Sequence, residues 1–109
     1  LEVIRVKGLT KDVRKIELTA KIDTGAFRSS IDEGVAKQLG LLRKDNVLYY
    51  RHYRSSLGRR QQRPVVGVTF WLKGRKIISA VNVTNRTKLR TKFLLGRKDL
   101  NGFVIRMEK

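Results

Sequence analysis

The group best suited to chemistry is a short carboxylate-containing segment, Asp23-Thr24-Gly25-Ala26, at the end of an apolar stretch. An acid followed by a hydroxyl and a glycine is a compact way to hold a carboxylate in a turn lined by backbone. Gly25 lets the chain turn and approach a neighbour closely, and Thr24 can hydrogen-bond the adjacent backbone. Asp and Gly also favour ordinary β-turns. The segment is therefore a candidate acid–base site, and other motifs in the sequence are needed to support this interpretation.

Few residues in the sequence suit metal or nucleotide chemistry. The chain has one histidine, His52, and no cysteine. A zinc site needs about three protein ligands, and the sequence has neither an H-E-x-x-H motif nor a Gly-rich phosphate loop. His52 lies between tyrosines and is interpreted as a structural residue of a strand. We expect neither a metal nor another cofactor.

The composition is strongly basic. Lys and Arg number 26 against 9 Asp and Glu, a formal net charge of +17. This charge favours polyanionic partners, whether nucleic acid, an anionic membrane surface or an acidic protein segment, and it does not choose among them. Five arginines lie between positions 51 and 63, and Arg28 follows Asp23 closely. Arginine binds carboxylates through paired donors, so the cluster suits an acidic peptide. It equally suits a solvated hairpin face or a phosphate-contacting arm.

Alternating apolar and polar residues predict a mostly β chain. Within 13–23, the apolar residues Ile16, Leu18 and Ala20 fall on one face, which is typical of a half-buried strand. This strand should form a hairpin with a first strand over 2–7. Further strands are expected at 47–55, 64–72, 76–83, 92–95 and 103–107. About seven short strands at this spacing close as a small barrel or sandwich.

One short helix is expected after the Asp23 segment. Ser30 and Glu33 have the spacing of a capping box, and Gly40 supplies the stop. The apolar residues of the expected helical face are Ile31, Val35 and Leu39. Asp32 and Glu33 are thereby interpreted as helix-start residues rather than catalytic acids. Asp99 is expected to begin one last helical turn.

The length of 109 residues predicts a single domain over 1–109. A chain of this size buries only about two-thirds of its unfolded surface, so an oligomer would add stability. The longest apolar runs are far below the roughly 20 residues of a membrane span. The lack of cysteine fits a reducing interior, and we expect a cytoplasmic protein without a membrane partner. A longer parent chain with fused domains stays open.

Several spaced motifs, in order, resemble the retropepsin-type aspartic proteases. The first half has an apolar strand, Asp-Thr-Gly-Ala and a helix in succession, and the second half has Phe93-Leu94-Leu95-Gly96-Arg97. More specifically, the chain resembles the cellular retropepsin-like family often labelled "ATP-dependent zinc protease". The residues that carry this resemblance are Arg54-Ser55-Ser56, Gly58, Arg63-Pro64-Val65-Val66 and Asn85-Arg86. The match spans roughly residues 14–106, although the chain lacks the residues that zinc or ATP would need.

The resemblance implies a small closed retropepsin-like barrel that acts as a homodimer. Aspartic protease chemistry needs two carboxylates that share a proton, and this chain supplies one Asp-Thr-Gly. Two copies of Asp23 would therefore meet at a two-fold axis, with Thr24 and Gly25 supporting them. A flap hairpin over 49–66 would cover an extended peptide. The expected substrate-binding residues are Ala26, Arg28, Arg54, Ser56, Arg59, Arg60 and Arg63.

The resemblance also indicates a substrate class, and two alternatives stay open. Some members of the family are linked to a glutamate ligase of the ATP-grasp class and remove added glutamates from a ribosomal protein, which agrees with an acidic peptide or protein tail. One alternative is a basic nucleic-acid- or ribosome-binding module, in which the tyrosines at 49, 50 and 53 stack on bases. The other is a catalytically inactive retropepsin-like binder of acidic peptides. Phe27 and Arg28 replace the small or polar residues more usual after Asp-Thr-Gly-Ala.

Overall fold

The polypeptide folds into a small barrel whose strands come from both halves of the chain. The computed structural model describes residues 1–11, 14–54 and 58–102. Its elements are β1 (Glu2–Lys7), β2 (Lys15–Asp23), β3 (Ser30–Asp32), α1 (Glu33–Gln38), the 3-10 helix η1 (Lys44–Asn46), β4 (Val47–Arg54), β5 (Arg60–Leu72), β6 (Arg75–Thr84), β7 (Phe93–Gly96) and the 3-10 helix η2 (Arg97–Leu100). The expected mostly β architecture with one short α-helix is confirmed for these residues.

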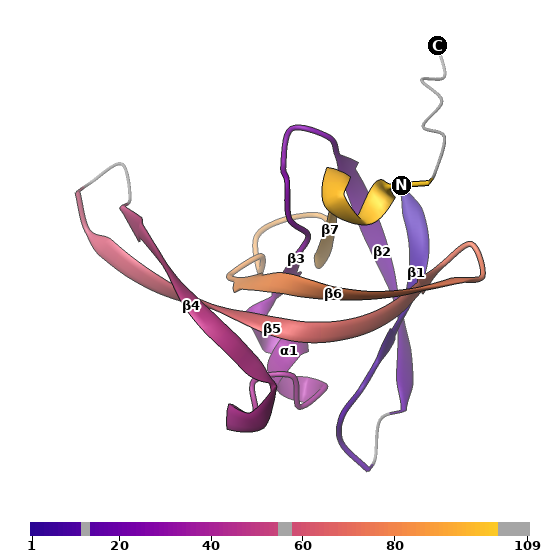
Figure 1. The fold of residues 1–109 in the computed structure, drawn as a ribbon, viewed down its shortest axis with the longest axis horizontal. Helices are drawn as coiled ribbons and strands as arrows, with labels where there is room; N and C mark the ends of the chain where they lie inside the picture. Colours follow the sequence, from indigo (N-terminus) through magenta and orange to yellow (C-terminus); the bar gives the residue numbers. More distant parts are fainter. Residues whose placement is uncertain (12–13, 55–57, 103–109) are drawn as a thin grey trace.

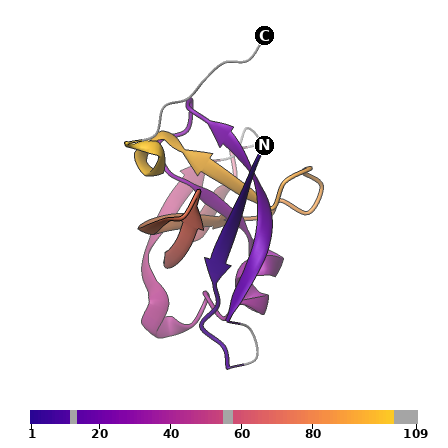
Figure 2. The ribbon, with the colours of Figure 1, turned by 90° about the vertical axis from the view of Figure 1, so that its right-hand side faces the viewer.

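Six of the strands close on themselves. Their order is β1-β2-β7-β3-β6-β5, and the additional pairing of β1 with β5 completes the ring. β4 pairs with β5 outside the ring, so that the β4–β5 hairpin extends away from the barrel body (Figure 1). Helix α1 and helix η2 lie at opposite ends of the barrel (Figures 1 and 2). The expected closed barrel is therefore confirmed.

The alternation of apolar residues determines what fills the barrel. β1 and β2 pair antiparallel from Glu2 opposite Ala20 to Lys7 opposite Lys15, which confirms the expected hairpin. The apolar alternate positions of β1, β5, β6 and β7 form a single buried cluster. At its centre, the rings of Phe70 and Phe93 have centroids 5.2 Å apart at a tilt of 58°. Burying each of these side chains contributes about 1.5–3 kcal/mol.

The segment before the helix differs from its prediction. Ser30–Asp32 forms the strand β3, which pairs parallel with β6 and antiparallel with β7. Helix α1 begins at Glu33 and Asp32 is its N-cap, because Asp32 Oδ2 accepts a hydrogen bond of 3.3 Å from the N–H of Val35. The expected capping box is wrong at its first residue, since the backbone of Ser30 is used by two neighbouring strands.

The remaining boundaries lie close to those expected from the sequence, with one large extension. β5 begins at Arg60 rather than at Pro64, so the β4–β5 hairpin is paired over more of its length. The β5–β6 turn is formed by Lys73 (φ 51°) and Gly74 (φ 78°), the left-handed pair that two-residue hairpins require. The strand expected at 103–107 lies outside the described residues. No helix in the described ranges is long and apolar enough to cross a bilayer.

Candidate active site

The Asp23 carboxylate lies where β2 ends and a tight loop begins. Asp23 is half-buried and is the last residue of β2, in register with Gly96 of the parallel strand β7. Its Oδ1 accepts a hydrogen bond of 2.9 Å from the N–H of Gly25, and its carbonyl accepts one of 3.2 Å from Ala26. Because the carboxylate is bonded to its own loop, its orientation is set by local backbone. Thr24 and Gly25 are exposed beside it.

The loop that carries Asp23 is tied to the start of η2. The N–H of Arg97 donates to the carbonyl of Ala26 at 2.9 Å, and the N–H of Lys98 donates to the carbonyl of Phe27 at 3.0 Å. The Arg97 guanidinium also donates to the carbonyl of Thr24 at 3.3 Å. Three carbonyls of one loop are thereby bonded to two consecutive residues of η2. This brings the Asp-Thr-Gly segment and the Leu-Leu-Gly-Arg segment together, although they are far apart in sequence.

Close backbone contact at this junction requires a glycine. A Cβ at Gly96 would lie 2.5 Å from the carbonyl carbon of Arg28 and 2.7 Å from the carbonyl oxygen of Phe27. Backbone atoms cannot move aside as the end of a flexible side chain can. Gly96 is therefore the residue that allows β7 to pass directly against the loop after Asp23.

A buried polar pair beneath the loop was not predicted. Ser29 Oγ donates to Asp99 Oδ2 at 2.6 Å and accepts from the N–H of Gly96 at 3.1 Å. Ser29 is fully buried and Asp99 is 7% exposed. The expectation that Asp99 begins a helical turn is wrong, because η2 begins at Arg97 and Asp99 is its third residue. Its partner Ser29 lies 70 positions earlier, and no local pattern indicates that pairing.

A second buried polar group lies at the start of α1, away from the Asp23 loop (Figure 1). Arg86 is 7% exposed and its N–H donates to Asp32 Oδ1 at 2.8 Å. Its guanidinium donates to the carbonyl and the hydroxyl of Thr91, at 3.0 and 3.2 Å. Burial lowers the pKa of Arg86 below its ordinary value, and the negative charge of Asp32 opposes this shift. The Asn85-Arg86 segment thus holds the loop before β7 against the start of α1.

Aromatic rings connect the Asp23 loop to the protruding hairpin. The Arg28 guanidinium carbon lies 5.8 Å from the ring centroid of Tyr49 on β4 and 5.7 Å from that of Phe27. The Arg97 guanidinium lies 5.4 Å from the same Phe27 ring. Cations at these distances are attracted to the faces of the rings. Arg28 and Tyr49 thereby form the contact between the loop of the candidate acid and the base of the hairpin.

The hairpin presents arginines on both of its faces. Arg51 is opposite Arg63, and Arg54 is opposite Arg60. Because directly paired residues share a face and successive residues alternate, Arg51 and Arg63 lie on the face of Tyr49. Arg54 and Arg60 lie on the other face. The predicted residue Arg59 is exposed next to β5, and Ser56 lies outside the described residues. The structure thus brings Arg28 to the Tyr49 face, but not Arg54 or Arg60.

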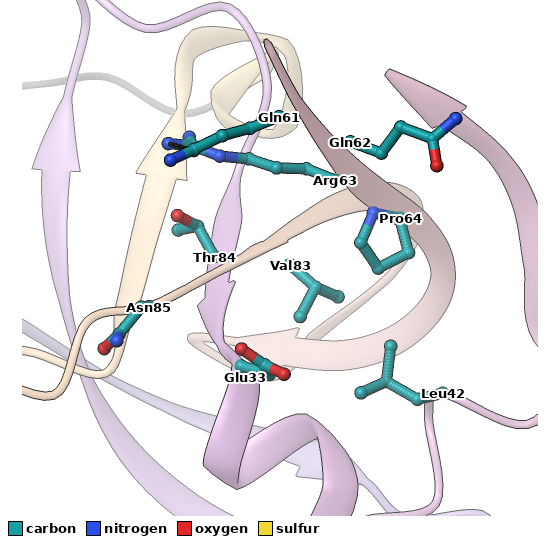
Figure 3. Close-up of a pocket in the computed structure, with 9 residues that line it drawn as sticks. All are labelled: Glu33, Leu42, Gln61, Gln62, Arg63, Pro64, Val83, Thr84 and Asn85. Atoms are coloured by element: carbon teal, nitrogen blue, oxygen red, sulfur yellow. Dashed lines mark hydrogen bonds between the residues drawn. The ribbon is translucent and has the colours of Figure 1, made fainter. Parts of the chain in front are cut away.

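A hollow of about 490 Å³ separates the hairpin from the barrel (Figure 3). It is lined by Glu33, Leu42, Gln61, Gln62, Arg63, Pro64, Val83, Thr84 and Asn85. Arg63 and Gln61 extend toward the side of Thr84 (Figure 3), and the Arg63 guanidinium donates to Gln61 Oε1 at 3.4 Å. The Asp23 loop is not part of this lining. The hollow was not predicted, because only the folded arrangement brings the end of β6 beneath β5.

The residues that the structure describes do not form a zinc site. Among residues 1–11, 14–54 and 58–102, no three His, Asp or Glu side chains lie close enough together to hold a metal ion. A zinc ion needs about three such ligands. The arrangement around Asp23 is instead one carboxylate held by backbone N–H, which suits proton transfer more than metal binding.

Comparison with known proteins places this arrangement in a recognisable fold. No protein-family model matches the chain, and no curated protein matches it in sequence. The protease of Simian Foamy Virus (mac) superposes with a TM-score of 0.68 at 18% identity, over 98% of this chain and 98% of that one. The Prototype Foamy Virus protease-reverse transcriptase superposes with a TM-score of 0.63 at 19% identity, over 100% of this chain and 12% of that one.

A bacterial structure is similar as well. Protein Lpg0085 of Legionella pneumophila, described as of unknown function (DUF785), gives a TM-score of 0.53 at 20% identity, over 94% of this chain and 85% of that one. The chain therefore has the retropepsin-like protease fold. At these identities the likeness establishes the fold and not the activity.

Proposed function

We propose that the protein is a homodimeric retropepsin-like aspartic peptidase in which Asp23 of each protomer forms the catalytic dyad. The observation that carries the proposal is the bond of 2.9 Å from the Gly25 N–H to Asp23 Oδ1, in a loop fixed to η2 by Arg97 and Lys98. This geometry supports a positioned acid at the end of β2. The retropepsin-like fold supports the same reading. One chain supplies one such acid, so the site is complete only with a second copy.

The dyad works by holding one proton between two carboxylates. Two like charges about 3 Å apart cannot both ionise, so the pair shares one proton. The ionised Asp23 takes a proton from a water, whose oxygen attacks the carbonyl carbon of the scissile peptide. The protonated Asp23 polarises and then protonates the carbonyl oxygen. Collapse of the tetrahedral intermediate transfers a proton to the leaving nitrogen, breaks the C–N bond and restores the dyad. The Gly25 N–H keeps each carboxylate oriented through these steps.

The proposed substrate is an acidic, glutamate-rich peptide or protein tail in extended conformation. Such a peptide would pair by main-chain hydrogen bonds along the hairpin. Arg28 lies on the hairpin face that also carries Arg51 and Arg63, and these guanidinium groups offer paired donors to carboxylates. Because these arginines suit an acidic substrate, we propose that the protein belongs to the cellular retropepsin-like family that its sequence resembles. The proposal does not include the zinc ion that the label of this family implies.

The test combines oligomeric state with hydrolysis. Sedimentation should show a dimer, and a fluorogenic glutamate-rich peptide should be cleaved. Asp23→Asn should abolish cleavage and keep the fold, because an amide oxygen can still accept the Gly25 N–H. Asp45→Asn is the matched control, since Asp45 is an exposed partner of Arg43 at 3.2 Å.

Mixing gives a second measurement of the dyad. Excess Asp23→Asn protein added to wild-type protein should form mixed dimers with a single acid. Activity should then fall more steeply than dilution alone explains. A monomeric protein, or an Asp23→Asn variant that cleaves as fast as wild type, contradicts the proposal.

A further inference from the structure

A basic face lies on the outside of the barrel around the Trp71 side chain. Trp71 of β5 is directly opposite Arg5 of β1 and Lys76 of β6, and Lys7 of β1 is opposite Lys15 of β2. These residues alternate with the buried core positions of their strands, so they point away from the core. Together with Lys73 in the β5–β6 turn, we call this group the Trp71 face.

The Trp71 face contains a hollow beside the indole. The hollow has a volume of about 370 Å³ and is lined by Val3, Arg5, Lys15, Glu17, Trp71, Lys73 and Gly74. The Lys15 ammonium lies 4.0 Å from the centroid of the half-buried Trp71 ring. An aromatic wall and an adjacent cation are thus already in contact. Val3, which is 56% exposed, adds an apolar edge.

Positive charge predominates on this face. Five cations surround the indole, namely Arg5, Lys7, Lys15, Lys73 and Lys76, and all five are exposed. Two carboxylates accompany them. Glu17 is opposite Arg5, and the half-buried Glu2 lies 3.9 Å from the exposed Lys73. Two carboxylates do not neutralise five cations, so the face keeps a net positive charge that attracts a polyanion.

We propose that the Trp71 face binds single-stranded nucleic acid, with a base against the indole and the adjacent phosphates on the surrounding Lys and Arg side chains. Proteins that bind single strands combine a positively charged surface with aromatic rings on which bases stack. An acidic peptide supplies carboxylates but no regular planar rings, so the indole favours a polynucleotide. The Lys15 ammonium lies over the Trp71 ring at 4.0 Å from its centroid, so a base that stacks on this face has to displace it. The displaced ammonium then lies next to the phosphate of the stacked nucleotide.

The Trp71 face is separate from the candidate active site. Lys15 and Asp23 are the two ends of β2, which places them about 26 Å apart at about 3.3 Å per residue. The β4–β5 hairpin and the β5–β6 turn also point to opposite sides of the barrel (Figure 1). A bound strand would therefore leave the hairpin open to substrate. The inference adds a second binding activity and does not depend on hydrolysis.

Trp71 is the sole tryptophan of the chain, so its fluorescence reports directly on the proposed contact. The probes are oligo(dT) and oligo(U) of about 12 nucleotides, titrated between about 50 and 300 mM salt. Both should quench the fluorescence, because stacking of a base on an aromatic ring tolerates different sequences. The logarithm of the binding constant should fall against the logarithm of salt with a slope of about −3.5, from five contacts of about 0.7 each.

Two variants and two controls test the assignment. Lys73→Gln with Lys76→Gln should reduce the salt slope by about 1.4, as measured by anisotropy of labelled oligonucleotide. Trp71→Leu should weaken binding and leave the salt slope unchanged. If Trp71→Leu lowers the stability of the protein, the Lys73→Gln and Lys76→Gln double variant still tests the assignment, because it changes only exposed residues. Lys44→Gln with Lys88→Gln, which removes two exposed lysines outside the face, should leave both quantities unchanged. Asp23→Asn should also bind as wild type.

Several outcomes would overturn the inference. Heparin or poly-glutamate that competes as strongly as oligonucleotide would show polyanion attraction without base contact. Vesicles of anionic lipid that quench Trp71 while oligonucleotides do not would assign the face to a membrane surface. Equal loss of binding in the Lys44 and Lys88 control would place the site elsewhere on the molecule.

Discussion

Ser29 and Asp99 lie 70 positions apart in the chain and share a buried hydrogen bond of 2.6 Å from Ser29 Oγ to Asp99 Oδ2. The same hydroxyl accepts the N–H of Gly96 at 3.1 Å. One side chain thus connects the loop after Asp23 with both β7 and η2. The position of the candidate acid therefore depends on a polar contact in the interior as well as on its own turn.

Removing this hydroxyl should destabilise the fold. Ser29→Ala leaves the Asp99 carboxylate and the Gly96 N–H buried without their partner, which costs about 1–3 kcal/mol. Urea unfolding followed by circular dichroism measures the change. Ser79→Ala is the control, because Ser79 is also buried but its hydroxyl makes only a 3.5 Å contact with the carbonyl of Ala80. If the two variants lose equal free energy of unfolding, the Ser29–Asp99 hydrogen bond contributes no more to stability than the weak contact of Ser79.

Much of the barrel was predictable because its strands carry their own pattern. β1 has its expected bounds, and β2, β6 and β7 begin or end within two residues of theirs. β2 alternates apolar and polar residues along most of its length, β1 and β6 do so loosely, and β7 is a short apolar run. Each of these patterns is a local property of the sequence. The Asp23 turn could likewise be predicted, since the acid, the hydroxyl and the glycine are adjacent in sequence.

The parts that were missed depend on distant partners. β3 has only three residues, too few to show a period, and it exists because β6 and β7 supply hydrogen bonds on both sides. The same three residues resemble a helix start, so local reasoning assigned them to α1. The contacts of Ser29 with Asp99 and of Arg28 with Tyr49 are non-local in the same way.

Replacing Gly96 should impair the candidate site more than the overall fold. Gly96→Ala places a Cβ 2.5 Å from the backbone of Arg28, so either β7 or the loop has to shift. Because Asp23 is in register with Gly96, the shift should misplace the carboxylate. We expect peptide hydrolysis to fall by about 100-fold, the loss that misplacement by about 1 Å can produce.

A turn glycine provides the control for Gly96. A Cβ at position 74 would have open space around it. The backbone φ of Gly74 is 78°, which Asn tolerates better than most residues, so Gly74→Asn should fit. This variant should keep both its stability and its rate of hydrolysis. An active Gly96→Ala protein would show that the close approach of β7 and the loop is not needed for catalysis.

Asp32 should be a structural acid rather than a catalytic one. Its two oxygens accept the N–H groups of Val35 and Arg86, at 3.3 and 2.8 Å. Asp32→Ala removes the cap of α1 and leaves a buried N–H unpaired, which together cost about 2–4 kcal/mol. Thermal unfolding should show this loss. Glu33→Gln removes only an exposed pair with Lys37 and should cost no more than about 0.5 kcal/mol.

Charge reversal on the two faces of the hairpin should separate direct substrate contact from general attraction. Arg28 lies beside Tyr49, on the face opposite to that of Arg60. Arg28→Glu should lower kcat/KM for a glutamate-rich peptide by about 10- to 100-fold, because a lost charge-assisted hydrogen bond is worth about 1.5–3 kcal/mol. Arg60→Glu changes the net charge equally and should have a much smaller effect.

Ionic strength provides the discriminating measurement for this pair of variants. At about 0.15 M salt, charges more than about 8 Å apart are largely screened, so the effect of Arg60→Glu should nearly vanish there. The effect of Arg28→Glu should persist, because a direct contact is screened much less. If the two variants lose activity equally at every salt concentration, the arginines act only through the overall field of the protein. The Tyr49 face of the hairpin would then not be the surface that recognises the substrate.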